Sequence, residues 1–336
     1  MDKKYKVSVL GDGGWGTALA LLSLRKGNPT FLWSAFPEYA QFLKEKRENK
    51  KFLPGIPIPP SMEIGSDLKE AVAFGEILVL AIPTQFLRNI LHKLKECDLS
   101  QKILVSVAKG IEKKTCLRPS EIVESILGSA RLVVLSGPSH AEEVARGIPT
   151  LVVVASKDAH SAHQAAEGLR DPHFRIYVQS DVVGTELGGA LKNVIAIAAG
   201  ICDGLGFGDN TKSGLLTRGL FEMAKLGVRV GANPNTFFGL SGVGDLMTTC
   251  FSPHGRNLRV GRELGKGKKI QEVLSGMEMV AEGVDTAEAV VTLASRVGIE
   301  LPIMSEVCNV LFRGKDCSRA VEDLLSRDAR EEWKQY

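Results

Sequence analysis

The sequence predicts an α/β protein of two domains: a doubly wound domain, residues 1–180, followed by an all-helical C-terminal domain, residues 181–336. The chain has 336 residues, enough for two ordinary domains with separate cores. Short β-branched runs alternate with helical patterns up to about residue 180. Beyond that point Ala, Gly, Leu and Glu recur at helical spacing and the strand pattern disappears.

Seven short apolar runs are the expected strands of the first domain. They cover residues 5–10, 30–33, 76–82, 102–108, 131–136, 150–156 and 174–179. Nearly continuous apolar strands separated by helices indicate a parallel sheet that helices cover on both faces. The last two runs lie closer together in the chain, which predicts a mixed edge. In the second domain, residues 186–201, 286–299 and 301–314 are the clearest helices.

The overall charge argues against a nucleic-acid partner. The formal net charge is +3 and the sequence pI is about 8.4. The basic residues are scattered along the chain, whereas a surface that binds a polyphosphate gathers them into a patch. We therefore expect a small-molecule ligand.

The cysteines and the N-terminus indicate a cytoplasmic protein. No CxxC motif or regular framework links the six cysteines, at positions 97, 116, 202, 250, 308 and 317, so we expect reduced thiols. Gly11 and Asp12 interrupt the first apolar run, which excludes a signal-peptide core. The apolar runs also fall short of the ~20 residues that a membrane helix requires, so no membrane span is expected.

Three glycines follow the first strand in the GxGxxG spacing of a dinucleotide-binding turn. Gly11 permits the tight turn, Gly13 lets the backbone approach a pyrophosphate, and Gly16 lets the helix pack on the strand. The motif alone is weak evidence, and a merely structural glycine turn is the alternative. Its place between a strand and a helix favours dinucleotide binding and a Rossmann-type domain.

The choice between NAD and NADP stays open. An acid at the end of the second strand binds the ribose of NAD, and an arginine there accommodates the 2′-phosphate of NADP. This chain has Ser34, Ala35 and Phe36 at that point, and Glu38 lies beyond Pro37. Neither the acid typical of NAD binding nor the arginine typical of NADP binding is present at this point.

Lys192 is the only charged residue between Glu186 and Asp203, in an otherwise small and apolar helical segment. One interpretation is that its methylene groups cover the helix while the ammonium reaches water. The other is a functional lysine, because burial of an ammonium is costly and lowers its pKa.

Two strand ends in the first domain carry further polar candidates. Lys109 ends one strand, and Gly137 and Ser139 follow another, where open α/β sheets place their ligands. A solvated loop lysine is the alternative for Lys109. A capping box formed with Glu142 is the alternative for Ser139.

The helical domain supplies a second set of candidates. Asp245 lies in an otherwise uncharged, glycine-flanked stretch, and Arg256 and Asn257 are adjacent. An arginine beside amide donors suits bidentate binding of phosphate. Taken singly, Asp245 could equally cap a helix and Arg256 could be a surface residue.

Over nearly its whole length the chain resembles the bacterial-type NAD(P)-dependent sn-glycerol-3-phosphate dehydrogenases. The resemblance is carried by "GDGGWGTALA", "VAKGIE", "SGPSHAEEV", "ELGGALKNVIAIAAGICDGLGFGDNTKSGLLTRG", "GVGDLMTTC", "GRN" and "VAEGVDTAEAV". It implies that this chain interconverts dihydroxyacetone phosphate and glycerol 3-phosphate with NAD or NADP, in the cytoplasm, and supplies phospholipid synthesis. A homodimer is the assembly considered, although the residues do not determine it.

The same resemblance implies a role for each matching residue. Lys192 is expected to be the general acid/base and Asp245 to position it. The cofactor is expected to contact Gly11, Gly13, Gly14, Trp15, Gly16, Phe36, Lys109, Ala141, Arg256, Val280 and Glu282. The substrate is expected to contact Lys109, Gly137, Ser139, Lys192, Asp245, Gly255, Arg256 and Asn257. Asn193 and Asn210 are further candidates.

Two departures from the family pattern stand out. The family often has basic residues after the tryptophan of the second strand, whereas "WSAF" has none, which argues against a preference for NADP. His140 stands where an aromatic residue is usual. Both departures leave the proposed catalytic groups in place.

No metal is expected in the site, because an ammonium can polarise the substrate carbonyl itself. His160 and His163 have the spacing of a metal pair but no nearby acid or thiol. Two competing functions remain at this point. One is a β-hydroxyacid dehydrogenase, whose substrates carry no phosphate. The other is a regulator that senses NAD(H) without turnover, for which no basic helix-turn-helix is found.

Overall fold

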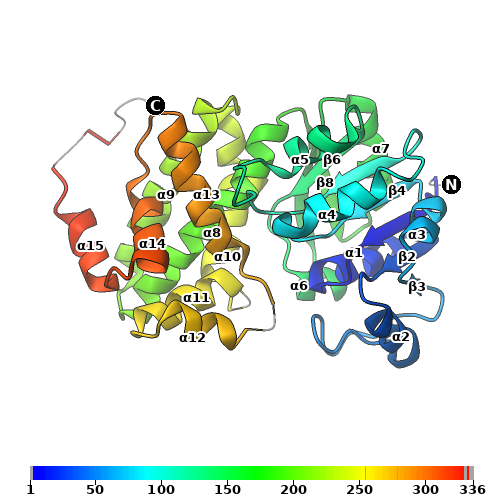
Figure 1. Ribbon diagram of the computed structural model, residues 1–336, viewed down its shortest axis with the longest axis horizontal. Coiled ribbons are helices and arrows are strands. Elements are labelled where there is room, and N and C mark those ends of the chain that lie inside the picture. The colour runs from blue at the N-terminus through cyan, green and yellow to red at the C-terminus, as the bar shows by residue number, and fades with distance from the viewer. Residues whose placement is uncertain (1–2, 254, 278, 329–330, 333–336) are drawn as a thin grey trace. The chain divides into compact units, whose positions relative to one another are not determined.

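The chain divides into two units in the computed structural model, which describes residues 3–253, 255–277, 279–328 and 331–332 (Figure 1). The first unit comprises Met1–Ala108 and Pro119–Thr185, and the second comprises Lys109–Arg118 and Glu186–Tyr336. The expected single boundary at residue 180 therefore misses one feature, because the segment 109–118 packs with the helical unit.

The first unit is built on one eight-stranded sheet with the order β3-β2-β1-β4-β5-β6-β7-β8. The strands are β1 (Val7–Leu10), β2 (Thr30–Trp33), β3 (Glu63–Gly65), β4 (Ile77–Leu80), β5 (Ile103–Ser106), β6 (Arg131–Ser136), β7 (Thr150–Ala155) and β8 (Phe174–Gln179). The first six strands in this order, from β3 to β6, are parallel to one another. Strand β7 is antiparallel to β6, and β8 is parallel to β7. The predicted doubly wound sheet with a mixed edge is confirmed. The sequence pattern missed β3, which has only three residues.

Helices cover both faces of this sheet. They are α1 (Gly14–Arg25), α2 (Pro37–Lys46), α3 (Leu68–Phe74), α4 (Thr84–Leu94), α5 (Pro119–Leu127), α6 (Ala141–Ala145) and α7 (Ala159–Leu169). Every residue of β1, β2, β4 and β5 is buried. Alternate side chains of a strand point to opposite faces, so complete burial requires cover on both. This explains why the strands read as continuous apolar runs.

The second unit is helical throughout its described residues, apart from loops. Its α-helices are α8 (Val182–Gly204), whose first residues belong to the first unit, α9 (Asp209–Arg229), α10 (Asp245–Phe251), α11 (Arg256–Gly265), α12 (Ile270–Ser275), α13 (Glu282–Arg296), α14 (Pro302–Arg313) and α15 (Cys317–Leu325). A 3₁₀ turn (Pro234–Phe238) and a π-type turn (Leu240–Gly244) precede α10. The predicted all-helical C-terminal domain is confirmed.

Helix α8 is the centre of the second unit. It is long and apolar enough to cross a membrane by composition, which the short apolar runs of the sequence did not suggest. Within its most apolar window, however, 94% of the residues are buried inside the protein. Such burial is expected for the central helix of a helical bundle.

Glycines let α8 and α11 pack backbone against backbone. A Cβ on Gly200 would lie 2.1 Å from the carbonyl oxygen of Leu258, and one on Gly261 would lie 2.0 Å from that of Ile197. Gly204 and Gly265 repeat this contact one turn further along. Since these neighbours are backbone atoms, they cannot move aside as a flexible side chain would.

We therefore expect Gly261→Ala to destabilise the protein by about 2 kcal/mol, because overpacking a tight contact forces the helices apart. Urea unfolding followed by circular dichroism measures this. The matched control is Gly214→Ala in α9, where a Cβ has nothing within 4 Å. That variant should be as stable as the parent or gain up to about 1 kcal/mol. Equal stability of Gly261→Ala and the parent would contradict the proposed packing.

Candidate active site

The glycine turn between β1 and α1 has the geometry that its spacing predicts. Gly11 has a φ of +125°, and a Cβ there would lie 2.3 Å from the carbonyl oxygen of Ala81. A Cβ on Gly16 would lie 1.9 Å from the carbonyl oxygen of Gly11. Gly13, at the N-cap of α1, has nothing within 4 Å of its Cβ position. The turn is tightly packed at its first and third glycines and open at the second.

The start of α1 fits the pyrophosphate of a dinucleotide. No acidic residue occupies its first turn, so its free amide groups present a positive field. Trp15 Nε1 is buried and has no hydrogen-bond partner among the described residues. Ala141, at the start of α6, lies 3.7 Å from the Cβ position of Gly14. The amide groups of α1 and the Trp15 indole can therefore donate to a phosphate group, and the open space at Gly13 leaves room for it.

Asp12 is a polar group at this turn that the sequence argument did not single out. Its carboxylate accepts a 2.6 Å hydrogen bond from Ser34 Oγ at the end of β2. Burial raises the pKa of Asp12, and the bond from Ser34 opposes that rise only in part. Phe36 is 67% exposed at the N-cap of α2. The carboxylate of Asp12, which follows β1, thus lies at the end of β2.

The loop after β6 disproves one alternative for Ser139. The N-cap of α6 is His140, and Ser139 Oγ donates a 2.8 Å hydrogen bond to the carbonyl of Gly137. A capping box between Ser139 and Glu142 is therefore wrong. Gly137 has a φ of +124°, so only glycine fits this turn without strain.

In the second unit, one buried carboxylate is shared by two lysines. Lys192 Nζ, from α8, donates a hydrogen bond to Asp245 Oδ1, and Lys109 Nζ lies 2.8 Å from Asp245 Oδ2. The side chains of Lys192, Asp245 and Lys109 are 7%, 2% and 15% exposed. The alternatives of a snorkelling Lys192 and a solvated Lys109 are wrong. Asp245 does not cap its helix either, because Gly244 is the N-cap of α10.

Burial and charge set the protonation of this cluster. Burial lowers the pKa of Lys192 to about 8, with Asp245 opposing the change and Lys109 adding to it. Burial raises the pKa of Asp245, but the two ammonium groups outweigh it and hold that pKa below its ordinary value. The cluster therefore holds an ionised carboxylate beside a lysine that can give or take a proton near neutral pH.

Thr249 is a contact of Lys192 that the sequence argument missed. Lys192 Nζ donates a 2.7 Å hydrogen bond to Thr249 Oγ1. Thr249 lies four residues after Asp245 on α10, so both side chains share one helix face. The spacing of four residues between Asp245 and Thr249 could have indicated from the sequence that Thr249 lies beside the lysine.

Close packing brings Lys192 and Asp245 together. A Cβ on Gly188 of α8 would lie 2.2 Å from the carbonyl oxygen of Ser241, in the turn that leads into α10. Asn193 Nδ2 then donates a 2.8 Å hydrogen bond to the carbonyl of Lys109. The adjacent residues Lys192 and Asn193 of α8 thus contact Asp245 and Lys109, the other two members of the cluster.

The predicted phosphate-binding pair begins α11. Gly255 is its buried N-cap. Asn257 is buried and accepts a 3.1 Å hydrogen bond from the backbone of Gly283. Arg256 is exposed and donates a 2.9 Å hydrogen bond to the carbonyl of Val280.

Gly283 links this pair to the lysine cluster. A Cβ on it would lie 2.7 Å from both the carbonyl oxygen of Asn193 and Asn257 Oδ1. Glu282, next to it, is the first residue of α13. The structure thus gathers α8, α11 and the start of α13 at one place.

Some candidates lie elsewhere. Asn210 lines a cavity that Lys192, Asp245 and Lys109 do not line. His160 and His163 are exposed on α7. Among the described residues, no three His, Cys, Asp or Glu side chains form a group that could hold a metal ion.

The chain is similar to known dehydrogenases over nearly its full length. Residues 6–162 match the family model for the NAD-dependent glycerol-3-phosphate dehydrogenase N-terminus, and residues 181–322 match that for the C-terminus. Glycerol-3-phosphate dehydrogenase [NAD(P)+] of Chlorobium phaeobacteroides is 47% identical over 97% of this chain and 99% of that protein. Its counterpart in Thermoanaerobacter sp. is 48% identical over 97% and 98%.

A solved structure shares the fold of the whole chain. The glycerol-3-phosphate dehydrogenase of Coxiella burnetii has a TM-score of 0.93 and 35% sequence identity, covering 96% of this chain and 99% of that one. A D-mandelate dehydrogenase complex with NADH, at a TM-score of 0.64 and 14% identity, shares the fold alone.

The shared carboxylate predicts unequal costs of substitution in the cluster. Asp245→Asn removes the counter-charge that Lys192 and Lys109 share and should lower the free energy of unfolding by about 3 kcal/mol or more. Lys109→Met leaves a balanced pair of Lys192 and Asp245 and should cost less. Urea unfolding at pH 7 compares the two variants. A smaller loss for Asp245→Asn than for Lys109→Met would contradict this charge balance.

Proposed function

The chain belongs to the NAD-dependent glycerol-3-phosphate dehydrogenase family, and we propose on this basis that it interconverts dihydroxyacetone phosphate and sn-glycerol 3-phosphate. The observation that carries the chemistry is the buried lysine beside an ionised carboxylate in the helical unit. A lysine with a lowered pKa is the proton donor and acceptor that reduction of a carbonyl requires.

Lys192 is the proposed general acid/base. A nicotinamide cofactor held by the glycine turn would supply a hydride to the carbonyl carbon of the substrate. The carbonyl oxygen gains a negative charge as this occurs and takes a proton from Lys192 Nζ, which becomes a neutral amine. In the reverse direction the amine removes the proton from the hydroxyl group. The low pKa of Lys192 makes both directions accessible near neutral pH.

Asp245 and Lys109 are the proposed positioning groups. The Asp245 carboxylate fixes the orientation of the Lys192 ammonium and stabilises its charged form. Lys109 shares that carboxylate, so its positive charge lowers the pKa of Lys192. We propose that Lys109 also contacts the substrate and the cofactor.

The start of α11 is the proposed phosphate site. Asn257 Oδ1 already accepts a hydrogen bond from Gly283, which leaves its amide nitrogen to donate to an anion. Arg256 adds a guanidinium, and the helix terminus adds free amide groups. Binding energy from the phosphate end of the substrate would then orient the reacting carbonyl. Gly137, Ser139 and Gly255 are the remaining proposed substrate contacts.

The glycine turn is the proposed nucleotide site. Gly11, Gly13 and Gly16 form it, and the start of α1 supplies its donors. The other proposed cofactor contacts are Gly14, Trp15, Phe36, Lys109, Ala141, Arg256, Val280 and Glu282. The absence of a basic side chain at residues 34–36 favours NAD in this proposal.

The cellular role is proposed from the family. Glycerol 3-phosphate is the backbone of glycerophospholipids, so we propose that the enzyme supplies their synthesis in the cytoplasm, as a homodimer.

The purified protein should oxidise NADH or NADPH when dihydroxyacetone phosphate is added. Loss of nicotinamide absorbance measures this, with the two cofactors in parallel and dihydroxyacetone as the phosphate-free control. We expect turnover that depends on the phosphate. Turnover of phosphate-free hydroxyacids instead would indicate a β-hydroxyacid dehydrogenase, and tight cofactor binding without any turnover would indicate a sensor.

Lys192→Ala should lower turnover by about 100-fold or more, because the developing alkoxide loses its proton donor. NADH binding, followed by fluorescence titration, should change little. Lys266→Ala, which removes an exposed lysine of the same unit, is the control. A Lys192→Ala variant with near-normal turnover would remove Lys192 from the mechanism.

The pH dependence should have opposite signs in the two directions. Reduction needs the ammonium form of Lys192, so its rate should fall as pH rises through about 8, whereas glycerol 3-phosphate oxidation should rise through the same range. In Asp245→Asn both midpoints should move to lower pH, because the carboxylate that favours the charged lysine is gone. Unchanged midpoints in that variant would show that another group titrates.

A further inference from the structure

The helical unit contains a cavity of about 650 Å³ that the proposed reaction does not use. It is lined by the end of α8, by α9 and α14, and by α15. None of Lys109, Lys192 and Asp245 lines it. Its volume lies within the range of pockets that hold small-molecule ligands.

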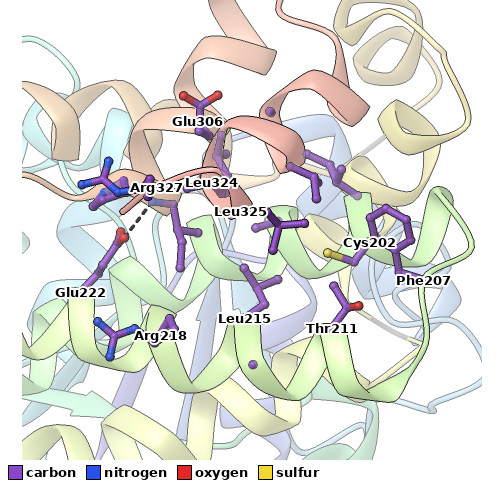
Figure 2. A pocket seen from close by; sticks show the side chains of 18 of the residues that line it. Cys202, Phe207, Thr211, Leu215, Arg218, Glu222, Glu306, Leu324, Leu325 and Arg327 are labelled. Carbon is purple, nitrogen blue, oxygen red and sulfur yellow. Dashed lines mark hydrogen bonds between the residues drawn. The ribbon is translucent and has the colours of Figure 1, made fainter. Parts of the chain in front are cut away.

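The cavity has one apolar end and one charged end. In Figure 2, Cys202, Phe207 and Thr211 lie at one end, and Arg218 and Glu222 lie at the other. Apolar side chains form most of the wall: Ala198, Ile201, Leu215, Phe221, Pro302, Ile303, Val307, Val310, Ala320, Val321, Leu324 and Leu325. Such a wall can take up an alkyl chain.

The carboxylates around the cavity already have hydrogen-bond or ion-pair partners within the protein. Glu222 accepts hydrogen bonds from the backbone amides of Ile303 (2.7 Å) and Met304 (3.1 Å) at the start of α14. Glu300 pairs with Arg327 at 3.2 Å. Glu306 pairs with Lys315 at 2.5 Å. Arg327 and Lys315 balance the charges of Glu300 and Glu306, and burial raises the pKa of Glu222 to about 7, so the acids exert little attraction on a cationic ligand.

Two cations of α9, Arg218 and Lys225, lower the pKa of Glu222 by their charge but form no ion pair with it. Arg218 donates one hydrogen bond to the carbonyl of Glu332 (3.1 Å), and Lys225 donates one to that of Glu300 (3.2 Å). Within the described part of the chain, the hydrogen-bond acceptors of both side chains are backbone carbonyls, and neither side chain forms an ion pair with a carboxylate. The Arg218 guanidinium also lies over the ring of Phe221, at 4.5 Å. It therefore keeps donors free at the charged end.

We propose that this cavity binds an amphiphile with one alkyl chain and one anionic head group. The alkyl chain lies along the apolar wall toward Cys202 and Phe207, and the head group accepts hydrogen bonds from Arg218 and Lys225. A carboxylate and a phosphate monoester share this chemistry, because both accept charge-assisted hydrogen bonds from a guanidinium.

Calorimetric titration of the full-length protein tests the proposal. The probes are decanoate and decyl phosphate below their micellar concentrations, butanoate with a shorter chain, and decyltrimethylammonium with the opposite charge. We expect saturable binding of one molecule of decanoate or decyl phosphate per chain, and the tighter of the two identifies the head group. Butanoate and decyltrimethylammonium should bind at least about tenfold more weakly.

Two variants locate the site. Arg218→Gln should weaken binding of the anionic probes about tenfold or more, whereas Arg229→Gln, on the same helix but outside the cavity wall, should leave it unchanged. Thr211→Trp fills the apolar end from an exposed position and should also weaken binding. Circular dichroism confirms that each variant is folded. Absence of saturable decanoate and decyl phosphate binding, equal binding of the cationic probe, or insensitivity to both variants would overturn the proposal.

Discussion

The Asp245 carboxylate, shared between Lys192 and Lys109, is the interaction on which the chemistry of the helical unit depends. Lys192 is buried and Lys109 is partly buried, and the carboxylate supplies a counter-charge to both, which offsets the cost of removing the ammonium groups from water. Burial in turn brings the pKa of Lys192 down to about 8. The same arrangement that stabilises the cluster therefore prepares a lysine for proton transfer, and neither property exists in the separate residues.

Small residues make that arrangement possible. Gly188 allows the turn before α10 to contact the backbone of α8, which brings Asp245 to Lys192. Gly200 and Gly261 let α8 and α11 touch, and Gly283 admits the start of α13 beside Asn257. Larger side chains at these points would separate the helices that carry the proposed proton donor and the proposed phosphate site.

The first unit was the more predictable half. Its strands are buried on both faces and therefore read as continuous apolar runs, and the glycine turn is specified by local spacing. The features that the sequence pattern did not predict are a very short strand and contacts between residues far apart in the chain. Strand β3 has three residues, too few to show a period, and Asp12 meets Ser34 only because β1 and β2 pair. Segment 109–118 joined the helical unit through contacts such as that of Asn193 with Lys109.

The sequence by itself determined the fold class, the glycine turn and the identities of the main candidate residues, because local periodicity and spacing encode them. Only the tertiary structure decided which candidates meet. Lys109 and Lys192 lie 136 and 53 residues from Asp245 in the chain, and no local pattern links positions so far apart. It also decided between a snorkelling and a buried Lys192, since the pKa of a lysine depends on the atoms packed around it.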